Sequence, residues 1–159
     1  MAHTPHPTPR RTALAAPTDL DVTLIRHLAT GHTLLTAAGA TSISFHAAKR
    51  RMDNLRAARH LPPTSAATVA WASRVGFLDG LDLGCRREVT LTGRQQDVLR
   101  LLPDGLSARQ IGRRLGVTEN TAKTHLQLAY DAIDARTSAH AVALDWRFGY
   151  SRLPGGEQR

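Results

Sequence analysis

Two stretches of this chain repeat one another at a nearly constant separation, and this repeat limits the folds open to the chain. The segment Leu-Ile-Arg-His-Leu at 24–28 leads to Gly31, and Val-Leu-Arg-Leu-Leu at 98–102 leads to Gly105, 74 residues later. Further along, residues 64–77 match residues 137–150 at a separation of 73, with seven of the 14 positions identical. We interpret this as a tandem duplication, which predicts two small units of similar fold joined by a linker.

The downstream copy carries the signals of four short helices. Two of the expected helix starts are followed three residues later by Gln95 and Gln110, the spacing of a capping box. Gly116 interrupts the chain between the second and third helices, and no strand-like alternation competes. The fold class expected is therefore all-α. The four helices should begin near Thr92, Ser107, Thr118 and Thr137.

The third of these helices has one apolar and one polar face. At about 100° per residue, an inward face is expected for Ala122, Leu126, Ala129 and Ile133. The opposite face holds Asn120, Lys123, Thr124 and Gln127. A polar face alone could be a solvated surface. After a capped helix and a glycine turn, however, it is what a helix-turn-helix needs in order to enter the major groove of DNA.

Residues 91–146 resemble the LuxR/GerE/NarL-type helix-turn-helix across almost the whole module. The resemblance implies a four-helix domain whose third helix reads the major groove and whose fourth commonly serves dimerisation. It implies base contacts for Lys123, Thr124 and Gln127, and backbone contacts for Arg109, Thr118 and Thr121.

The downstream copy departs from the pattern of that family at three positions. Gln95 stands where an acidic residue is usual, Gly112 replaces a common alanine, and Ala122 replaces a common valine. The last two changes shrink the core, so we expect them to affect stability more than fold.

The upstream copy is the weaker match. By the repeat, its third helix starts at Ser44, with Lys49, Arg50 and Asp53 facing the bases and His46 beside them. Its inward positions are Ala48, Met52 and Leu55, while Leu20 replaces Arg94 and Ala37 replaces Ile111. Three roles stay open for this half: a second reading head, a phosphate clamp without sequence preference, or a degenerate copy kept for packing and dimerisation. We favour contact with DNA.

The charge of the chain favours a polyanionic partner. There are 21 Lys and Arg against 13 Asp and Glu, which gives a net charge of +8 and a pI near 11.1. Residues 18–74 hold seven basic and three acidic residues, whereas residues 91–146 hold seven and six. The upstream half is thus expected to attract DNA more strongly, through Arg50, Arg51, Arg56 and Arg59.

Composition and motif spacing argue against several other classes of protein. Cys85 is alone, so an internal disulfide or a cysteine zinc site is impossible, and no apolar run approaches the about 18 residues of a membrane span. We expect no enzyme, cofactor, metal or membrane association, no small-molecule ligand, and a cytoplasmic protein that associates with the nucleoid when bound. The expected parts are a disordered arm (1–16), the upstream unit (17–77), a linker (78–90), the downstream unit (91–150) and a tail (151–159).

Two functional hypotheses follow from the sequence. The first is a sequence-specific regulator of transcription that binds double-stranded DNA with the third helix of each of two tandem LuxR-like units. A homodimer through a fourth helix is one possible assembly; the other is a single chain that spans two half-sites. The second hypothesis is a helical protein-interaction module that binds or sequesters another regulator, with little DNA binding of its own.

Overall fold

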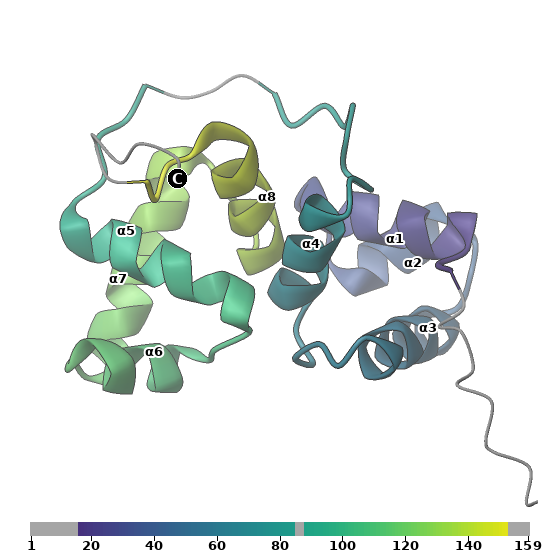
Figure 1. Ribbon diagram of the computed structural model, residues 1–159, viewed down its shortest axis with the longest axis horizontal. Coiled ribbons are helices and arrows are strands. Elements are labelled where there is room, and N and C mark those ends of the chain that lie inside the picture. Colours follow the sequence, from purple (N-terminus) through teal and green to yellow (C-terminus); the bar gives the residue numbers. More distant parts are fainter. Residues whose placement is uncertain (1–15, 85–87, 153–159) are drawn as a thin grey trace, which may run out of the picture.

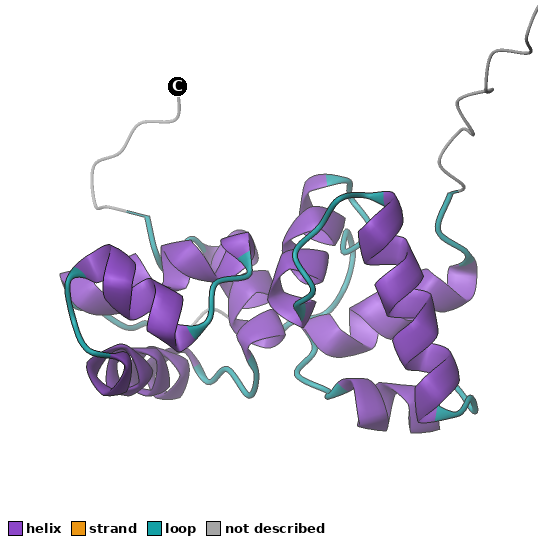
Figure 2. Ribbon diagram, turned by 90° about the horizontal axis from the view of Figure 1, so that it is seen from below, coloured by secondary structure: helices purple, strands orange, loops and turns teal. Residues whose placement is uncertain are grey.

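The computed structural model describes residues 16–84 and 88–152, and within these ranges every regular element is helical (Figure 2). Eight α-helices and one short 3₁₀ helix follow one another along this part of the chain. Their bounds are α1 (Asp19–Ala29), α2 (Leu34–Ala40), α3 (Phe45–Ala58), α4 (Ser65–Arg74), α5 (Gly93–Leu101), η1 (Leu102–Asp104), α6 (Ala108–Leu115), α7 (Glu119–Ile133) and α8 (Ser138–Phe148). None of them is long and apolar enough to cross a membrane.

Side-chain caps decide where these helices begin. Every α-helix is preceded by a Ser or Thr whose hydroxyl accepts from the backbone N–H three residues later, which satisfies a donor that the helix leaves free. The starts predicted in the downstream half are confirmed, as are both predicted capping boxes. Ser44 caps α3 as expected.

The helices form two groups that meet in the middle of the molecule. Figure 1 shows α1, α2 and α3 on one side and α5, α6 and α7 on the other, with α4 and α8 side by side between them. The described parts of the segment that joins α4 to α5 (75–84 and 88–92) run over the surface, although Leu78, Leu81 and Leu83 still pack against the core. Helices α3 and α7, the third helix of each predicted unit, thus lie on opposite flanks of the molecule.

One hydrophobic core runs through both groups. Its largest fully buried side chains include Leu24, Ile25 and Met52 in the first group and Leu99 and Ile111 in the second. Ala48, Met52 and Leu55 point inward from α3 as the repeat predicts. Burial of these apolar side chains, each contributing about 1.5–3 kcal/mol, holds the short helices together.

Candidate nucleic-acid interface

The connection from α6 to α7 is a tight turn built by two glycines and a cap. Gly116 ends α6 with a left-handed φ of 69°, and Thr118 then caps α7. Gly112 lies under this turn, where a Cβ would be 2.9 Å from the carbonyl oxygen of Val117 and 3.0 Å from that of Thr118. The absence of a side chain at Gly112 therefore lets the turn close against α6, and no space is left there for the alanine expected from the resemblance.

Helix α7 buries the face that was predicted to point inward and exposes the polar one. Ala122, Ala129 and Ile133 are buried, while Leu126 is half-buried at the edge of the core. The exposed residues include six of the seven predicted DNA-contacting positions, and the seventh, Thr121, is half-buried. The exposed six are Arg109, Thr118, Asn120, Lys123, Thr124 and Gln127.

The polar side chains of α7 are held by neighbours one turn away. The Lys123 Nζ lies 2.7 Å from the Glu119 Oε1, and this contact lowers the pKa of the Glu119 carboxyl. The Gln127 amide donates to the Asp131 carboxylate at 2.8 Å. Both pairs are exposed, so solvent screens them and a competing ligand can replace them at little cost.

Tyr130 belongs to the same outer surface, and the sequence analysis missed it. Together with Lys123, Thr124, Leu126 and Gln127, it lines an open hollow along α7. Burial of its ring raises the pKa of the Tyr130 hydroxyl to about 12, so the phenol stays protonated and able to donate. Its position three residues after Gln127 was the available signal, because residues three apart share a helix face.

Four of the five predicted contact residues on α3 and at its cap are exposed, and the fifth is less accessible. Ser44, His46, Lys49 and Arg50 are exposed, and the Ser44 hydroxyl is occupied as the cap of the helix. Asp53 is less accessible, because its carboxylate accepts from the Lys49 Nζ at 2.7 Å and from the Arg56 guanidinium at 3.2 Å. These contacts, the Lys49 hydrogen bond first, lower the pKa of Asp53.

Three arginines that were expected to attract DNA from the upstream half have partners inside the protein instead. Arg56 is buried, and its Nε donates to the Thr68 hydroxyl at 2.8 Å. Arg51 pairs with Asp21 at 3.3 Å. The Arg59 guanidinium lies 4.7 Å from the centre of the Trp71 ring. Of the four, Arg50 alone is exposed without a partner among the residues that the structure describes, so it is the most accessible of them to a phosphate.

Two further features were not anticipated from the sequence. Thr18 and Asp21 form a capping box at the start of α1, in the place that Thr92 and Gln95 take before α5. Ser151, assigned above to the tail, is buried: it donates to the Asp145 carboxylate, and its carbonyl accepts from Arg100 at 2.8 Å. The other parts of the expected tail and arm (153–159 and 1–15), and Cys85, lie outside the described residues.

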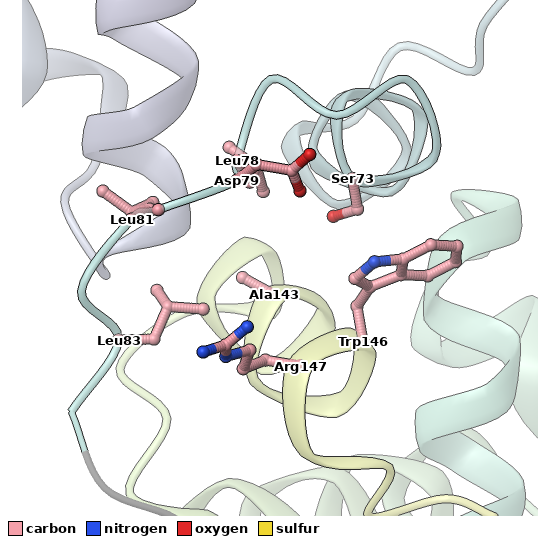
Figure 3. Close-up of a pocket in the computed structure, with 9 residues that line it drawn as sticks. Ser73, Leu78, Asp79, Leu81, Leu83, Ala143, Trp146 and Arg147 are labelled. Carbon is pink, nitrogen blue, oxygen red and sulfur yellow. The ribbon is translucent and has the colours of Figure 1, made fainter.

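A pocket of about 290 Å³ opens between the end of α4, the connecting segment and α8 (Figure 3). Ser73 reaches it from α4, and Trp146 and Arg147 reach it from α8. Trp146 is 51% exposed at this pocket, whereas Trp71 packs against Phe77 with ring centres 5.5 Å apart. Among the described residues no cluster of His, Cys, Asp and Glu is placed to hold a metal ion.

Comparison with known proteins identifies the downstream half. Residues 89–144 match the model of the family described as bacterial regulatory proteins, luxR family. Over 55 residues the chain is 40% identical to a "Probable transcriptional regulatory protein SgaR" of Hyphomicrobium methylovorum, a stretch that covers 35% of this chain and 26% of that relative. The chain thus spans about a quarter of the length of this curated relative. No solved structure matches the chain significantly. Residues 89–144, which contain α5, α6 and α7, therefore match a LuxR-type helix-turn-helix domain.

Proposed function

We propose that the protein is a sequence-specific regulator of transcription that binds double-stranded DNA, with α7 as a recognition helix in the major groove. One observation carries the proposal: within the LuxR-type segment, α7 turns Lys123, Thr124 and Gln127 to solvent and its alanine face to the core. Lysine and glutamine side chains suit guanine and adenine edges, and threonine can reach either a base or a phosphate.

The surroundings of α7 support this role. Arg109, Arg113 and Arg114 are exposed on α6, the helix that precedes the turn. A cationic α6 beside a polar α7 concentrates positive charge where the DNA backbone would lie on either side of the groove, despite the low net charge of the downstream half. We assign phosphate contacts to Thr118 and Thr121, which lie at the start of α7.

We further propose that α1–α4 form a second, diverged unit of the same type. The caps support this, because Thr18, Thr33 and Ser44 precede α1, α2 and α3, each 74 residues before the residue that caps the matching downstream helix. Thr64 likewise caps α4, 73 residues before Thr137. Capping positions set helix starts, so both halves of the chain carry the same helix pattern.

In this second unit, α3 would lie against DNA with its exposed face. Ser44, His46, Lys49 and Arg50 are the accessible residues, and Arg50 is a donor suited to guanine or phosphate. The Asp53 carboxylate forms ion pairs with Lys49 and Arg56. If Asp53 accepts from a cytosine amine, the ion pair with Lys49 has to open first. A head with sequence preference is the role we favour over a simple phosphate clamp.

Selection from a random pool of duplexes tests the proposed function. The full chain should enrich one sequence, and Lys123→Ala/Gln127→Ala should lower affinity for it by about 10- to 100-fold, the equivalent of about 1–3 kcal/mol. Arg147→Ala is the control, because it removes an exposed positive charge from α8 and leaves α7 intact. Equal affinity of the double variant and the wild type for the selected site would refute the role of α7.

A second candidate is a module that binds another regulator through the same helix. Leu128, on α7, is 49% exposed, and the ends of Lys123 and Gln127 are already engaged within the helix. A salt titration separates the two functions, because phosphate contacts release counterions and binding then weakens steeply with salt. Absence of any binding to pooled genomic fragments at low salt would favour the protein partner.

A further inference from the structure

The central turns of helices α4 and α8 are buried on all sides. Five consecutive residues of α4, 66–70, are buried, and so are six consecutive residues of α8, 139–144. At about 3.6 residues per turn, such runs cover every face of a helix. A helix buried all round has packing partners on two opposite sides.

Each of the two helices packs against its own group and against the other. Helix α4 contacts α1 in its own group and α8 and η1 in the other. Helix α8 contacts α5, α7 and η1 in its own group and α4 and α1 in the other. Helix η1 lies 74 residues after the end of α1, so the two are equivalent in the repeat. The contact of α1 with α8 is therefore equivalent to the contact of η1 with α4.

Two glycines show this reciprocity at the level of atoms. Gly31 follows α1, and a Cβ there would lie 2.9 Å from the His140 Nδ1 and 3.2 Å from the Arg136 Cδ, at the start of α8. Gly105 follows η1, and a Cβ there would lie 2.5 Å from the Pro62 Cβ and 2.9 Å from the Thr64 Oγ1, at the start of α4. The turn at Gly31 therefore packs against the start of α8, and the turn at Gly105 packs against the start of α4.

Two equivalent positions of the repeat also lie at one pocket between the helices. Ser73 on α4 and Trp146 on α8 are separated by 73 residues, so they are equivalent in the repeat. Both line this pocket, as Figure 3 shows. Equivalent residues lie close to each other only near a two-fold axis. The side chains themselves differ, so the symmetry is approximate.

From these contacts we infer that the chain forms an internal two-fold pair, in which α4 and α8 make the contact that two separate subunits would make in a dimer. If the protein binds DNA as proposed above, on which this consequence rests, one chain occupies both half-sites of a bipartite DNA site. The central turns of both fourth helices are packed inside the chain, so a homodimer that used the same faces would require the two groups to separate. Each group presents the same surface to the other, as two subunits do in a two-fold dimer. Such a contact is closed and cannot add a further copy.

The same arrangement specifies the kind of DNA site. Lys49 and Lys123 are equivalent, but Arg50 stands opposite Thr124 and Asp53 opposite Gln127 in the repeat. Two heads related by a two-fold axis read half-sites in inverted orientation, and unlike side chains read unlike bases. The target is therefore a site of two inverted half-sites with different sequences, bound in one orientation.

Stoichiometry and spacing test the inference with the full chain and the selected duplex. Sedimentation velocity should give a monomer without DNA and one chain per duplex with it, and the footprint should cover both half-sites. Insertion of five base pairs, about half a helical turn, between the half-sites should lower affinity at least about tenfold, because rigidly paired heads cannot follow the rotation. Two chains on one palindromic duplex, or a footprint of one half-site, would overturn the inference.

Matched glycine variants test the pairing from the protein side. Gly80, in the connecting segment, and Gly105 have the same left-handed φ, 70°, but nothing lies within 4 Å of a Cβ at Gly80. Both alanine variants suffer the same backbone strain, and only Gly105→Ala also pushes against Pro62 and Thr64. Relative to Gly80→Ala, Gly105→Ala should bind the two-half-site duplex at least about tenfold more weakly, with little change on the downstream half-site alone. Equal loss in both variants on both duplexes would overturn the pairing.

These outcomes separate the inference from the proposed function. If no duplex is enriched at any salt concentration, the proposed function fails. If a duplex is enriched but carries two chains, or tolerates the five-base-pair insertion, DNA binding stands and the internal pair fails. Helix content and the thermal midpoint, measured by circular dichroism, identify any variant that has simply unfolded; for such a variant the insertion experiment on the wild-type protein decides.

Discussion

The His140 ring accepts a hydrogen bond at Nδ1 from the backbone N–H of Arg136, at 3.2 Å, while the same nitrogen lies against the turn at Gly31. Acceptance at Nδ1 requires that this nitrogen carry no proton. Burial lowers the pKa of His140, the charge of Arg136 lowers it further, and Asp134 opposes these effects. The junction between the two helical groups therefore favours a neutral histidine.

Stability should accordingly fall as the solution is acidified below about pH 6.5, the ordinary pKa of histidine. The unfolded chain binds this proton more readily than the folded one, so the free energy of unfolding decreases with falling pH until the lowered folded pKa is passed. The slope from one group cannot exceed about 1.4 kcal/mol per pH unit. Thermal melts from pH 8 to pH 5 measure it, with His140→Gln as the comparison. An identical pH dependence in that variant would contradict the assignment to His140.

Gly112→Ala should destabilise the protein, although alanine normally favours a helix. The added Cβ would meet the carbonyl oxygens of Val117 and Thr118, which are backbone atoms and can move only with the turn. We expect a loss of about 1–3 kcal/mol in the free energy of unfolding, measured by chemical denaturation. Gly39→Ala is the matched control, since Gly39 is exposed within α2 with nothing near its Cβ position. That variant should gain about 0.5–1 kcal/mol, and a gain in both variants would disprove the tight turn.

Asp53→Asn should weaken the fold of the upstream half. The carboxylate neutralises the buried Arg56 guanidinium, whose Thr68 hydrogen bond alone cannot offset the loss of the opposite charge. A decrease of about 1–3 kcal/mol is expected in the free energy of unfolding. Lys49→Ala breaks only the exposed ion pair and should cost less than about 1 kcal/mol. A variant of unchanged stability that selects a different DNA sequence would instead place Asp53 at a base.

Glu119→Gln should strengthen DNA binding. The Glu119 carboxylate holds the Lys123 ammonium at 2.7 Å and would repel nearby phosphates, so its removal frees the lysine and reduces the repulsion. We expect a gain of about two- to tenfold in affinity at low salt, shrinking as salt is added. Glu88→Gln makes the same change of net charge at an exposed position outside α7. If both variants gain equally, the effect comes from net charge and the Lys123 contact is not involved.

The sequence predicted the helix starts well, because a cap is a local interaction. A Ser or Thr hydroxyl and the backbone N–H three residues later lie within one helical turn, so their spacing can be read without knowledge of the rest of the fold. The inward face of α7 was predictable for the same reason, since helical periodicity alone places Ala122 and Ala129 together. The capping box of Thr18 and Asp21 was missed because its third residue is Asp, where the usual capping box has Glu or Gln.

Charge was predicted less well, because a count of basic residues does not say which of them have partners. Arg56 and Arg51 were counted toward the attraction of DNA, but the fold brings Thr68 to the first and Asp21 to the second. Those partners lie 12 and 30 residues away in the chain. Pairings over such separations depend on how helices pack, which local sequence patterns do not specify.

The sequence by itself determined the downstream helices and their caps, since these follow from interactions within a turn, and direct comparison of two segments predicts that their pattern is repeated upstream. Only the tertiary structure decided how the two groups meet. It brings α4 against α8 and places Gly31 and Gly105 at reciprocal positions against the opposite groups. Helices faced with small residues can pack in several ways at similar cost, and the close approach of backbone at both glycines is what selects one of them.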